Sequence, residues 1–410
     1  MTHSEPSAAA EWRAHWPMVA AAMAGLSFAT FSIYAMGLFM EPLSREFGWT
    51  RQQISAGLST TALFAVPLSP LVGALIDKWG SRRLAIPGII MAACAYAALS
   101  LASGSLTQWF GLWVVYGCVA LAIKTTVWTA AVSSVFNASR GLALAVALCG
   151  AALAQTIAPL LAQWLIDGYG WRSAFFWMGF GWGGVVLMLV LLFFFDARDV
   201  RRRAAAIAGV AAVRPILSGL TLREGVRNQQ LLRIAGALLI ATFLGVAMTV
   251  HKVPILTEGG ITRHTAAQIA ASAGVAGILG KLLSGWLLDR WQNGWISGIT
   301  LGLPAAAFVM LLEPVRTPTL TVIAMLIFGF SAGAYLQVCT YLTTRYGGMR
   351  NFGKIFGCMA SLMALGSALG PPVAGRIYDQ YGSYSPFLIA GIPAALFCGL
   401  LVTGLGRYPE

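Results

Sequence analysis

The chain contains twelve apolar runs of about 20 residues each, and this repetition limits its possible folds more than any other feature. The runs lie roughly at 17–40, 53–76, 84–103, 108–132, 141–166, 174–195, 231–253, 265–288, 295–312, 318–341, 354–377 and 385–405. A run of this length matches a helix that crosses the hydrocarbon core of a bilayer. Only 10% of the 410 residues are charged, against about 25% in soluble domains. The sequence therefore predicts an all-α membrane protein with twelve transmembrane helices.

One longer polar stretch separates the first six runs from the last six. It predicts a cytoplasmic N-terminal tail at 1–16, a six-helix bundle at 17–195, a cytoplasmic linker at 196–230, a second six-helix bundle at 231–405 and a C-terminal tail at 406–410. Of the 27 Lys and Arg residues, 18 fall on the side of the termini, 7 on the opposite side and 2 inside helices. The positive-inside rule places the richer side in the cytoplasm. We expect a multi-pass protein of the cell (inner) membrane with both termini cytoplasmic.

Several classes of function are excluded by the placement of reactive and charged residues. The net charge of +13 is spread over short loops, so no nucleic-acid partner is expected. The six cysteines lie inside apolar runs without CxxC spacing, so we expect neither disulfides nor a metal site. The runs hold no nucleophile–base pair, and the sequence therefore predicts no enzyme and no cofactor.

Four helix ends share one pattern, in which an aspartate is followed two residues later by Trp or Tyr. The aspartates are Asp77, Asp167, Asp289 and Asp379, separated by 90, 122 and 90 residues. Two halves of six helices, each made of two units of three, explain this spacing. Since three is odd, successive units must point in opposite directions through the membrane. Inverted three-helix repeats of this kind are typical of secondary transporters.

The segment Gly73-Ala-Leu-Ile-Asp77-Lys-Trp-Gly80-Ser-Arg82-Arg83 resembles the loop signature between helices 2 and 3 of the major facilitator superfamily. Gly285–Arg290 resembles its weaker second copy. Segments that begin at Tyr34, Arg140 and Arg345 resemble the monocarboxylate transporter and oxalate/formate antiporter branch. The resemblance covers essentially the whole chain and implies the fold of that superfamily, with 3+3 inverted repeats in each half.

A carboxylate at a helix end can pair with a nearby arginine or cap a neighbouring helix. Such a clasp would hold one conformational state and break in the other. The signature and its copy predict a conformational clasp formed by Gly73, Asp77, Gly80, Arg82, Arg83, Asp289 and Arg290.

All 14 acidic residues are predicted in loops or at helix ends, whereas Lys124 and Lys281 are predicted inside helices. Lys124 lies sixteen residues before Arg140, about 24 Å along a helix. Lys281 lies eight residues before Asp289, about 12 Å. An intramembrane charge costs at least about 2.5–3.5 kcal/mol and usually marks a functional site. Two such cations without a fixed counter-ion favour an anionic substrate.

The resemblance supports this interpretation, because Lys281 matches a position where the branch carries a basic, substrate-binding residue, usually arginine. The sequence departs from the pattern elsewhere: Cys358–Met363 holds no cation on helix 11, and we find neither the lysine of helix 1 nor the aspartate of helix 8 of monocarboxylate members. Polar and aromatic residues on other helices are further candidates for the binding pocket: Tyr34, Trp128, Gln155, Tyr335 and Gln337.

The sequence therefore predicts a secondary active transporter of small mono- or dicarboxylates that works by alternating access. The expected partners are the organic anion, a proton or counter-anion and the lipid bilayer, and the protein is expected to be a monomer. Because no buried carboxylate can carry a proton, a proton must travel on a lysine or on the substrate. Proton symport is favoured, carboxylate antiport is an alternative, and a drug or cation exporter of the same fold is less favoured because such exporters usually need a buried carboxylate.

Overall fold

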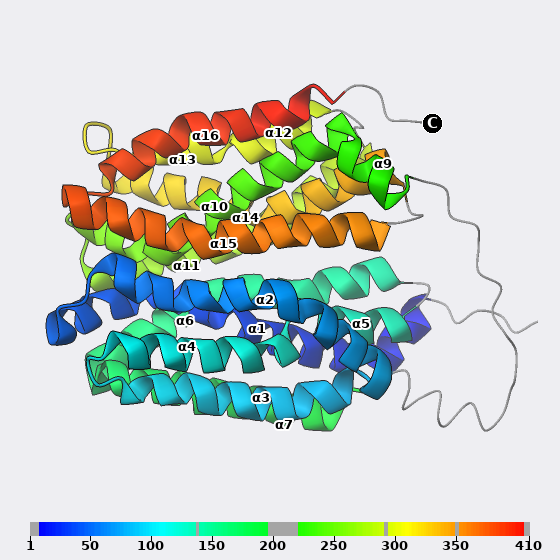
Figure 1. Cartoon of the computed structure of the whole chain (residues 1–410), viewed down its shortest axis with the longest axis horizontal. Coiled ribbons are helices and arrows are strands. Elements are labelled where there is room, and N and C mark those ends of the chain that lie inside the picture. The colour runs from blue at the N-terminus through cyan, green and yellow to red at the C-terminus, as the bar shows by residue number, and fades with distance from the viewer. Residues whose placement is uncertain (1–7, 137–138, 196–219, 291–293, 349–351, 406–410) are drawn as a thin grey trace, which may run out of the picture. The chain divides into compact units, whose positions relative to one another are not determined.

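The computed structural model describes residues 8–136, 139–195, 220–290, 294–348 and 352–405, and the elements of these ranges are helices (Figure 1). Ten helical segments in these ranges are long and apolar enough to cross a membrane. One of them, Leu142–Phe193, is 52 residues long and contains Gly170 in a non-helical conformation. The class predicted from the sequence, a multi-pass helical membrane protein, is confirmed.

The chain forms two compact units. Unit 1 comprises Met1–Tyr34 and Phe64–Ala212, and unit 2 comprises Ala35–Leu63 and Val213–Glu410. The segment Ala35–Leu63 therefore groups with the C-terminal helices, although the sequence places it in the first half. The predicted division into tails, linker and six-helix bundles stays a prediction.

Unit 1 is built around an aromatic core. Tyr96 packs on Trp113, Tyr116 and Phe175, with ring centroids 5.3–6.5 Å apart. Wholly or in part, its helices are α1 (Ala8–Phe47), α2 (Arg51–Trp79), α3 (Ser81–Ala97), α4 (Leu106–Ala120), α5 (Thr125–Val135), α6 (Arg140–Trp177) and α7 (Gly183–Phe193), with short 3-10 turns at Ala98–Leu101 and Leu121–Ile123 and a π-helical turn at Met178–Trp182.

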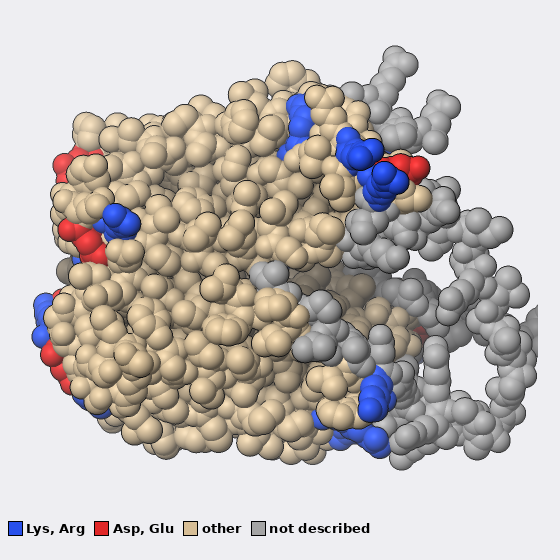
Figure 2. Space-filling view, in the orientation of Figure 1, with Lys and Arg blue, Asp and Glu red and all other residues tan. Residues whose placement is uncertain are grey.

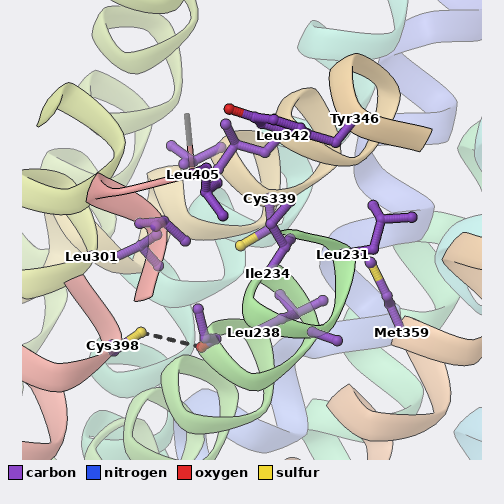
Figure 3. Close-up of a cluster of buried hydrophobic side chains, with 14 of the residues drawn as sticks. Leu231, Ile234, Leu238, Leu301, Cys339, Leu342, Tyr346, Met359, Cys398 and Leu405 are labelled. Atoms are coloured by element: carbon purple, nitrogen blue, oxygen red, sulfur yellow. Dashed lines mark hydrogen bonds between the residues drawn. The ribbon is translucent and has the colours of Figure 1, made fainter. Parts of the chain in front are cut away.

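Unit 2 holds an aliphatic core at one end of its helices, where Leu231, Leu301, Cys339, Met359 and Cys398 meet (Figure 3). The Cys398 thiol donates to the carbonyl of Ala237 at 3.1 Å. The helices of unit 2 are α9 (Leu222–Arg227), α10 (Gln229–Glu258), α11 (Arg263–Arg290), α12 (Gly294–Gly302), α13 (Pro304–Leu311), α14 (Pro318–Gly347), α15 (Phe352–Tyr381) and α16 (Ser385–Thr403), together with the end of α1 from Ala35 and the start of α2 up to Leu63.

Three of the four aspartate motifs end in the same backbone turn. Gly80, Gly170 and Gly382 each lie three residues after the motif aspartate, and their φ angles are 89°, 81° and 67°. A positive φ strongly favours glycine. The fourth equivalent position, Gln292, lies outside the described residues. The repeat in the sequence therefore has a structural counterpart in these turns.

Large apolar side chains remain exposed along the helices of both units, including Leu101 at 68%, Met188 at 63% and Leu400 at 64%. On the face drawn in Figure 2, the visible charged side chains gather at the helix ends and leave the middle of each unit free of them. Soluble proteins rarely expose apolar surface this extensively. The pattern fits helices whose outer faces contact lipid.

Candidate functional site

Lys124 lies at a break in its transmembrane segment. The 3-10 turn Leu121–Ile123 ends before it, α5 begins after it at Thr125, and Lys124 itself is extended with φ −65° and ψ 165°. The expectation of a lysine deep in one continuous helix is therefore corrected: the lysine occupies the N-cap of a half-helix. The N-terminus of a helix carries partial positive charge, and broken helices of transporters aim such ends at anionic groups.

The side chain of Lys124 is half-buried, and the next two residues, Thr125 and Thr126, are exposed. Among the described residues, the Lys124 ammonium has neither a hydrogen bond nor an ion pair. A cation, a helix N-terminus and two hydroxyl side chains thus lie together in three consecutive residues. This arrangement can bind a carboxylate through charge and hydrogen bonds.

Trp128 stabilises this break. The N–H of Val127 donates to the carbonyl of Lys124 at 2.9 Å, so the carbonyl of Ile123 loses the partner it would have in a continuous helix. The indole Nε1 of Trp128 donates to that carbonyl at 2.7 Å. Its ring is fully buried against Gly25 and Phe194, with centroids 5.0 Å apart. The structure shows that Trp128 supports the break, and its predicted contact with substrate stays a prediction.

Lys281 lies on α11, which runs unbroken from Arg263 to Arg290. The helix packs directly on α14: a Cβ at Gly280 or Gly333 would collide with the main chain of Phe330 or Gly277. Small residues allow this approach of two membrane helices. The packing fixes the backbone on which the half-buried Lys281 stands. Lys281 also has a partner of its own within the protein.

The remaining pocket candidates are divided between the units. Tyr34 is half-buried on α1 at the end of the unit 1 segment. Gln155 on α6 is 5% exposed, and its amide Nε2 lacks a hydrogen-bond partner among the described residues. In unit 2, α14 carries both Tyr335, which is half-buried, and Gln337, which is exposed. Their contact with substrate stays a prediction.

The clasp predicted around Asp77 is only partly described. The turn expected at Gly80 is present. Arg82 donates from Nη2 to the carbonyl of Leu191 at 2.9 Å, and its guanidinium lies 4.8 Å from the ring centroid of Phe195. Arg83 is exposed. The surroundings of Gly73 and the side chains of Asp77 and Asp289 lie outside the described part. The guanidinium of Arg290 lies 5.9 Å from the ring centroid of Trp286.

Sequence reasoning missed a third buried lysine. Lys252 was counted among the seven basic residues of the non-cytoplasmic side, but it lies inside α10, is 1% exposed and donates from Nζ to the carbonyl of Ala270 at 3.1 Å. The apolar run ends at 253, yet α10 continues through Pro254 to Glu258. When Lys252 is counted as a residue inside a helix, 18 basic residues lie on the side of the termini and 6 on the opposite side. The direction of the charge asymmetry is therefore unchanged.

The described ranges contain no group of three or more His, Cys, Asp or Glu residues that could hold a metal ion. The candidate site at Lys124 consists of a cation, two hydroxyl groups and a helix N-terminus.

Comparison with known proteins identifies the class. A model of the Major Facilitator Superfamily matches residues 20–346 and 239–409, and the chain belongs to this superfamily of membrane transporters. The most similar solved structures include a bacterial homolog of the human lysosomal transporter Spinster in an inward-facing and unoccupied conformation. The two structures match with a TM-score of 0.66 and a sequence identity of 18%. The match covers 94% of this chain and 93% of that chain.

Curated relatives place the chain near one branch of the superfamily. It is 26% identical to monocarboxylate transporter 13 of Bos taurus over 92% of this chain and 84% of that protein. It is 29% identical to monocarboxylate transporter 11 of Homo sapiens over 92% and 80%. A bacterial relative, the 4-hydroxybenzoate transporter PcaK of Acinetobacter baylyi, is 25% identical over 81% of each chain. The predicted resemblance to monocarboxylate transporters is confirmed, and the relatives point to transport rather than catalysis.

Proposed function

We propose that the protein is a secondary active transporter of small mono- or dicarboxylates, coupled to proton symport. The observation that carries this proposal is Lys124, a cation at the N-cap of a half-helix, followed by two exposed threonines. An ammonium and a helix N-terminus both attract negative charge. The names of the relatives, monocarboxylate and 4-hydroxybenzoate transporters, agree with an anionic substrate.

Lys281 supplies a second cation, on a helix held rigidly by its packing on α14. Lysine keeps the positive charge that a carboxylate needs but lacks the planar fork of arginine, which binds carboxylates with two parallel hydrogen bonds. We therefore expect recognition of charge more than of the exact geometry of the carboxylate. Tyr34, Gln155, Tyr335 and Gln337 are proposed to donate further hydrogen bonds to the substrate.

We further propose twelve transmembrane helices in 3+3 inverted repeats. The turns at Gly80, Gly170 and Gly382 support the repeat. So do Gly48 and Gly260, which lie 212 residues apart and have φ angles of 68° and 81°. The 52-residue segment interrupted at Gly170 supplies two helices in this scheme. We also propose that both termini lie in the cytoplasm, which the charge asymmetry favours, and that the protein is a monomer of the inner membrane.

The clasp around Asp77 is proposed to control the conformational cycle. The glycine turn at Gly80 and the hydrogen bond of Arg82 to the carbonyl of Leu191 on α7 hold the start of α3. A carboxylate there would act on the rate of interconversion rather than on substrate affinity.

Uptake of a panel of labelled carboxylates into proteoliposomes, with and without an inward proton gradient, tests the proposal. We expect uptake of at least one carboxylate, stimulated by the gradient and nearly electroneutral for a monoanion. Uptake that ignores the gradient but requires anion inside the vesicle would establish exchange instead of symport. Transport of cations with no carboxylate transported would overturn the proposal.

A further inference from the structure

The start of α2 is held by residues of α15 and of the turn before α16, both in unit 2. Asp379 at the end of α15 accepts hydrogen bonds from the main-chain N–H groups of Arg51 and Gln52 at 3.1 and 3.0 Å. The N–H of Thr50 donates to Oε1 of Gln53 at 3.0 Å, and the N–H of Gln53 donates to the hydroxyl oxygen of Thr50 at 3.2 Å. The N–H groups of Arg51, Gln52 and Gln53 in the first turn of α2 therefore all have acceptors. Two of these acceptors are the carboxylate oxygens of Asp379 on α15. We call the cluster of Arg51, His251, Pro371, Asp379 and Tyr384 the α2 junction.

The guanidinium of Arg51 joins the same cluster. It donates from Nη1 to the hydroxyl of Tyr384 at 2.9 Å, and it stacks 3.5 Å from the ring centroid of Tyr378. Tyr384 precedes α16 and is 1% exposed. Burial raises the pKa of Tyr384 and outweighs the opposing effect of Arg51, so the hydroxyl keeps its proton and remains able to donate.

His251 on α10 is fully buried beneath this contact. Its Nε2 lies 2.9 Å from the carbonyl of Pro371, and its Nδ1 lies 2.7 Å from the hydroxyl of Tyr384. A carbonyl can only accept, so Nε2 must carry the proton. In the neutral ring Nδ1 then accepts from Tyr384, while the Tyr384 oxygen accepts from Arg51. The hydrogen bonds run in one direction, from Arg51 through Tyr384 and His251 to Pro371.

A second proton on His251 is incompatible with this arrangement. Nδ1 would become a donor aimed at an oxygen that already accepts from Arg51, and the hydroxyl proton of Tyr384 would lose its acceptor. The imidazolium and the guanidinium would also share one hydroxyl group, and like charges at close range repel.

The carboxylates of Asp379 in the junction and of Glu258 beside it already have partners. Asp379 binds the start of α2, and Glu258 accepts from the main chain of Tyr384 at 3.1 Å and from the hydroxyl of Ser383 at 2.6 Å. Lys252, next to His251 in the chain, donates to the carbonyl of Ala270 on α11. The ionisable groups around His251 on α2, α10, α15 and the turn before α16 are Arg51, Lys252, Glu258, Tyr378, Asp379 and Tyr384.

We propose that His251 is a proton-binding site of the transport cycle, whose protonation releases the start of α2 from the α2 junction. The inference rests on the proposed proton-coupled transport and assigns its proton to a residue outside the lysine sites. Because the intact junction excludes the second proton, protons bind preferentially to the released state. Acidification must therefore favour release, by up to about tenfold in the population ratio per pH unit.

The test measures the distance between spin labels at two exposed positions of unit 2, introduced as Glu46→Cys before α2 and Gln380→Cys at the end of α15. The full chain, with its six native cysteines replaced, is placed in nanodiscs without substrate and examined by pulsed EPR from pH 8 to pH 5. We expect a longer-distance population that grows as the pH falls. His251→Gln is the matched variant, because an amide can donate to Pro371 and accept from Tyr384 but cannot titrate. Its distances should be independent of pH.

Tyr384→Phe provides a second variant that keeps the ring but removes the shared hydroxyl. We expect it to populate the released state already at pH 8, with a weaker response to acid. A wild-type distance distribution that is unchanged from pH 8 to pH 5, or an equal acid response in His251→Gln, would overturn the proposal. Since these measurements need no substrate, they separate failure of this inference from failure of carboxylate transport.

Discussion

Lys124 in unit 1 and Lys281 in unit 2 stand on different kinds of backbone. Lys124 lies where its segment breaks, so its charge adds to that of a helix N-terminus and to the exposed hydroxyls of Thr125 and Thr126. Lys281 lies in an unbroken helix pressed against α14 through glycines, where main-chain N–H groups are used within the helix. The first site can offer several donors to an anion, whereas the second offers one ammonium.

This difference predicts unequal contributions to transport. A half-helix terminus adds about 0.3–2 kcal/mol to the binding of an anion beyond the charged side chain itself. Removal of the Lys124 ammonium would also leave a bound anion without its positively charged partner. We therefore expect Lys124 to matter more than Lys281 for the same substrate.

The largest effect is expected for Lys124→Gln. Loss of one partner of a buried charge pair costs about 2–5 kcal/mol, so kcat/KM for a carboxylate should fall at least about 30-fold. Uptake into proteoliposomes at matched protein content measures this loss. Lys124→Arg, which keeps the charge, is the control and should retain much of the activity. Full transport by Lys124→Gln would remove the reason for treating the helix break as a binding site.

Lys281→Gln should reduce kcat/KM by a smaller factor, about 10- to 30-fold, because no helix terminus acts with this lysine. Lys281→Arg should match or exceed the wild type, since arginine can bind a carboxylate with two hydrogen bonds. The same uptake assay measures both variants. A loss larger than that of Lys124→Gln would reverse the ranking of the two lysines.

Trp128→Phe tests whether the break itself matters. The ring remains, but the carbonyl of Ile123 loses its donor, and a buried unsatisfied group costs about 1–3 kcal/mol. Transport should fall about 3- to 10-fold, together with a lower apparent Tm. Trp113→Phe in the same unit is the matched control, because the Trp113 indole nitrogen is buried without a hydrogen-bond partner among the described residues. Equal losses of transport and Tm in Trp128→Phe and Trp113→Phe would show that the substitutions act through ring packing and not through the hydrogen bond to Ile123.

The smallest effect on substrate binding is expected for Asp77→Asn. The residue lies at the end of α2 beside the Gly80 turn, away from both lysines in the sequence. Since conformational steps often limit turnover in proteins that open and close, kcat should fall severalfold while KM changes less than about twofold. Steady-state uptake kinetics separate the two constants. A large rise in KM at unchanged kcat would place Asp77 in the binding machinery.

The sequence predicted the parts that depend on composition and on short-range turn chemistry. Apolar runs marked the membrane helices, and the aspartate repeat lies directly before the turns at Gly80, Gly170 and Gly382, where a positive φ favours glycine. These features need no knowledge of which helices pack together.

The features that depend on packing were not predictable. Neither Gly nor Pro stands beside Lys124 to indicate the break in the helix. The break is stabilised by the hydrogen bond from Trp128 to the carbonyl of Ile123. Conversely, the apolar run ends at 253, whereas α10 continues through Pro254 to Glu258 and buries Lys252. His251 is buried by residues from distant parts of the chain, at positions 371 and 384. Such long-range contacts leave no local signal in the sequence.

Whether Lys124 selects its ligand by negative charge is the central claim, and one binding experiment tests it most directly. A transported carboxylate and its uncharged amide of the same skeleton compete for the purified protein in wild-type form and as Lys124→Gln. We expect the wild type to prefer the carboxylate by at least about 30-fold and Lys124→Gln to lose most of that preference. A wild type that binds the amide as tightly as the carboxylate, or an undiminished preference in Lys124→Gln, would contradict the account.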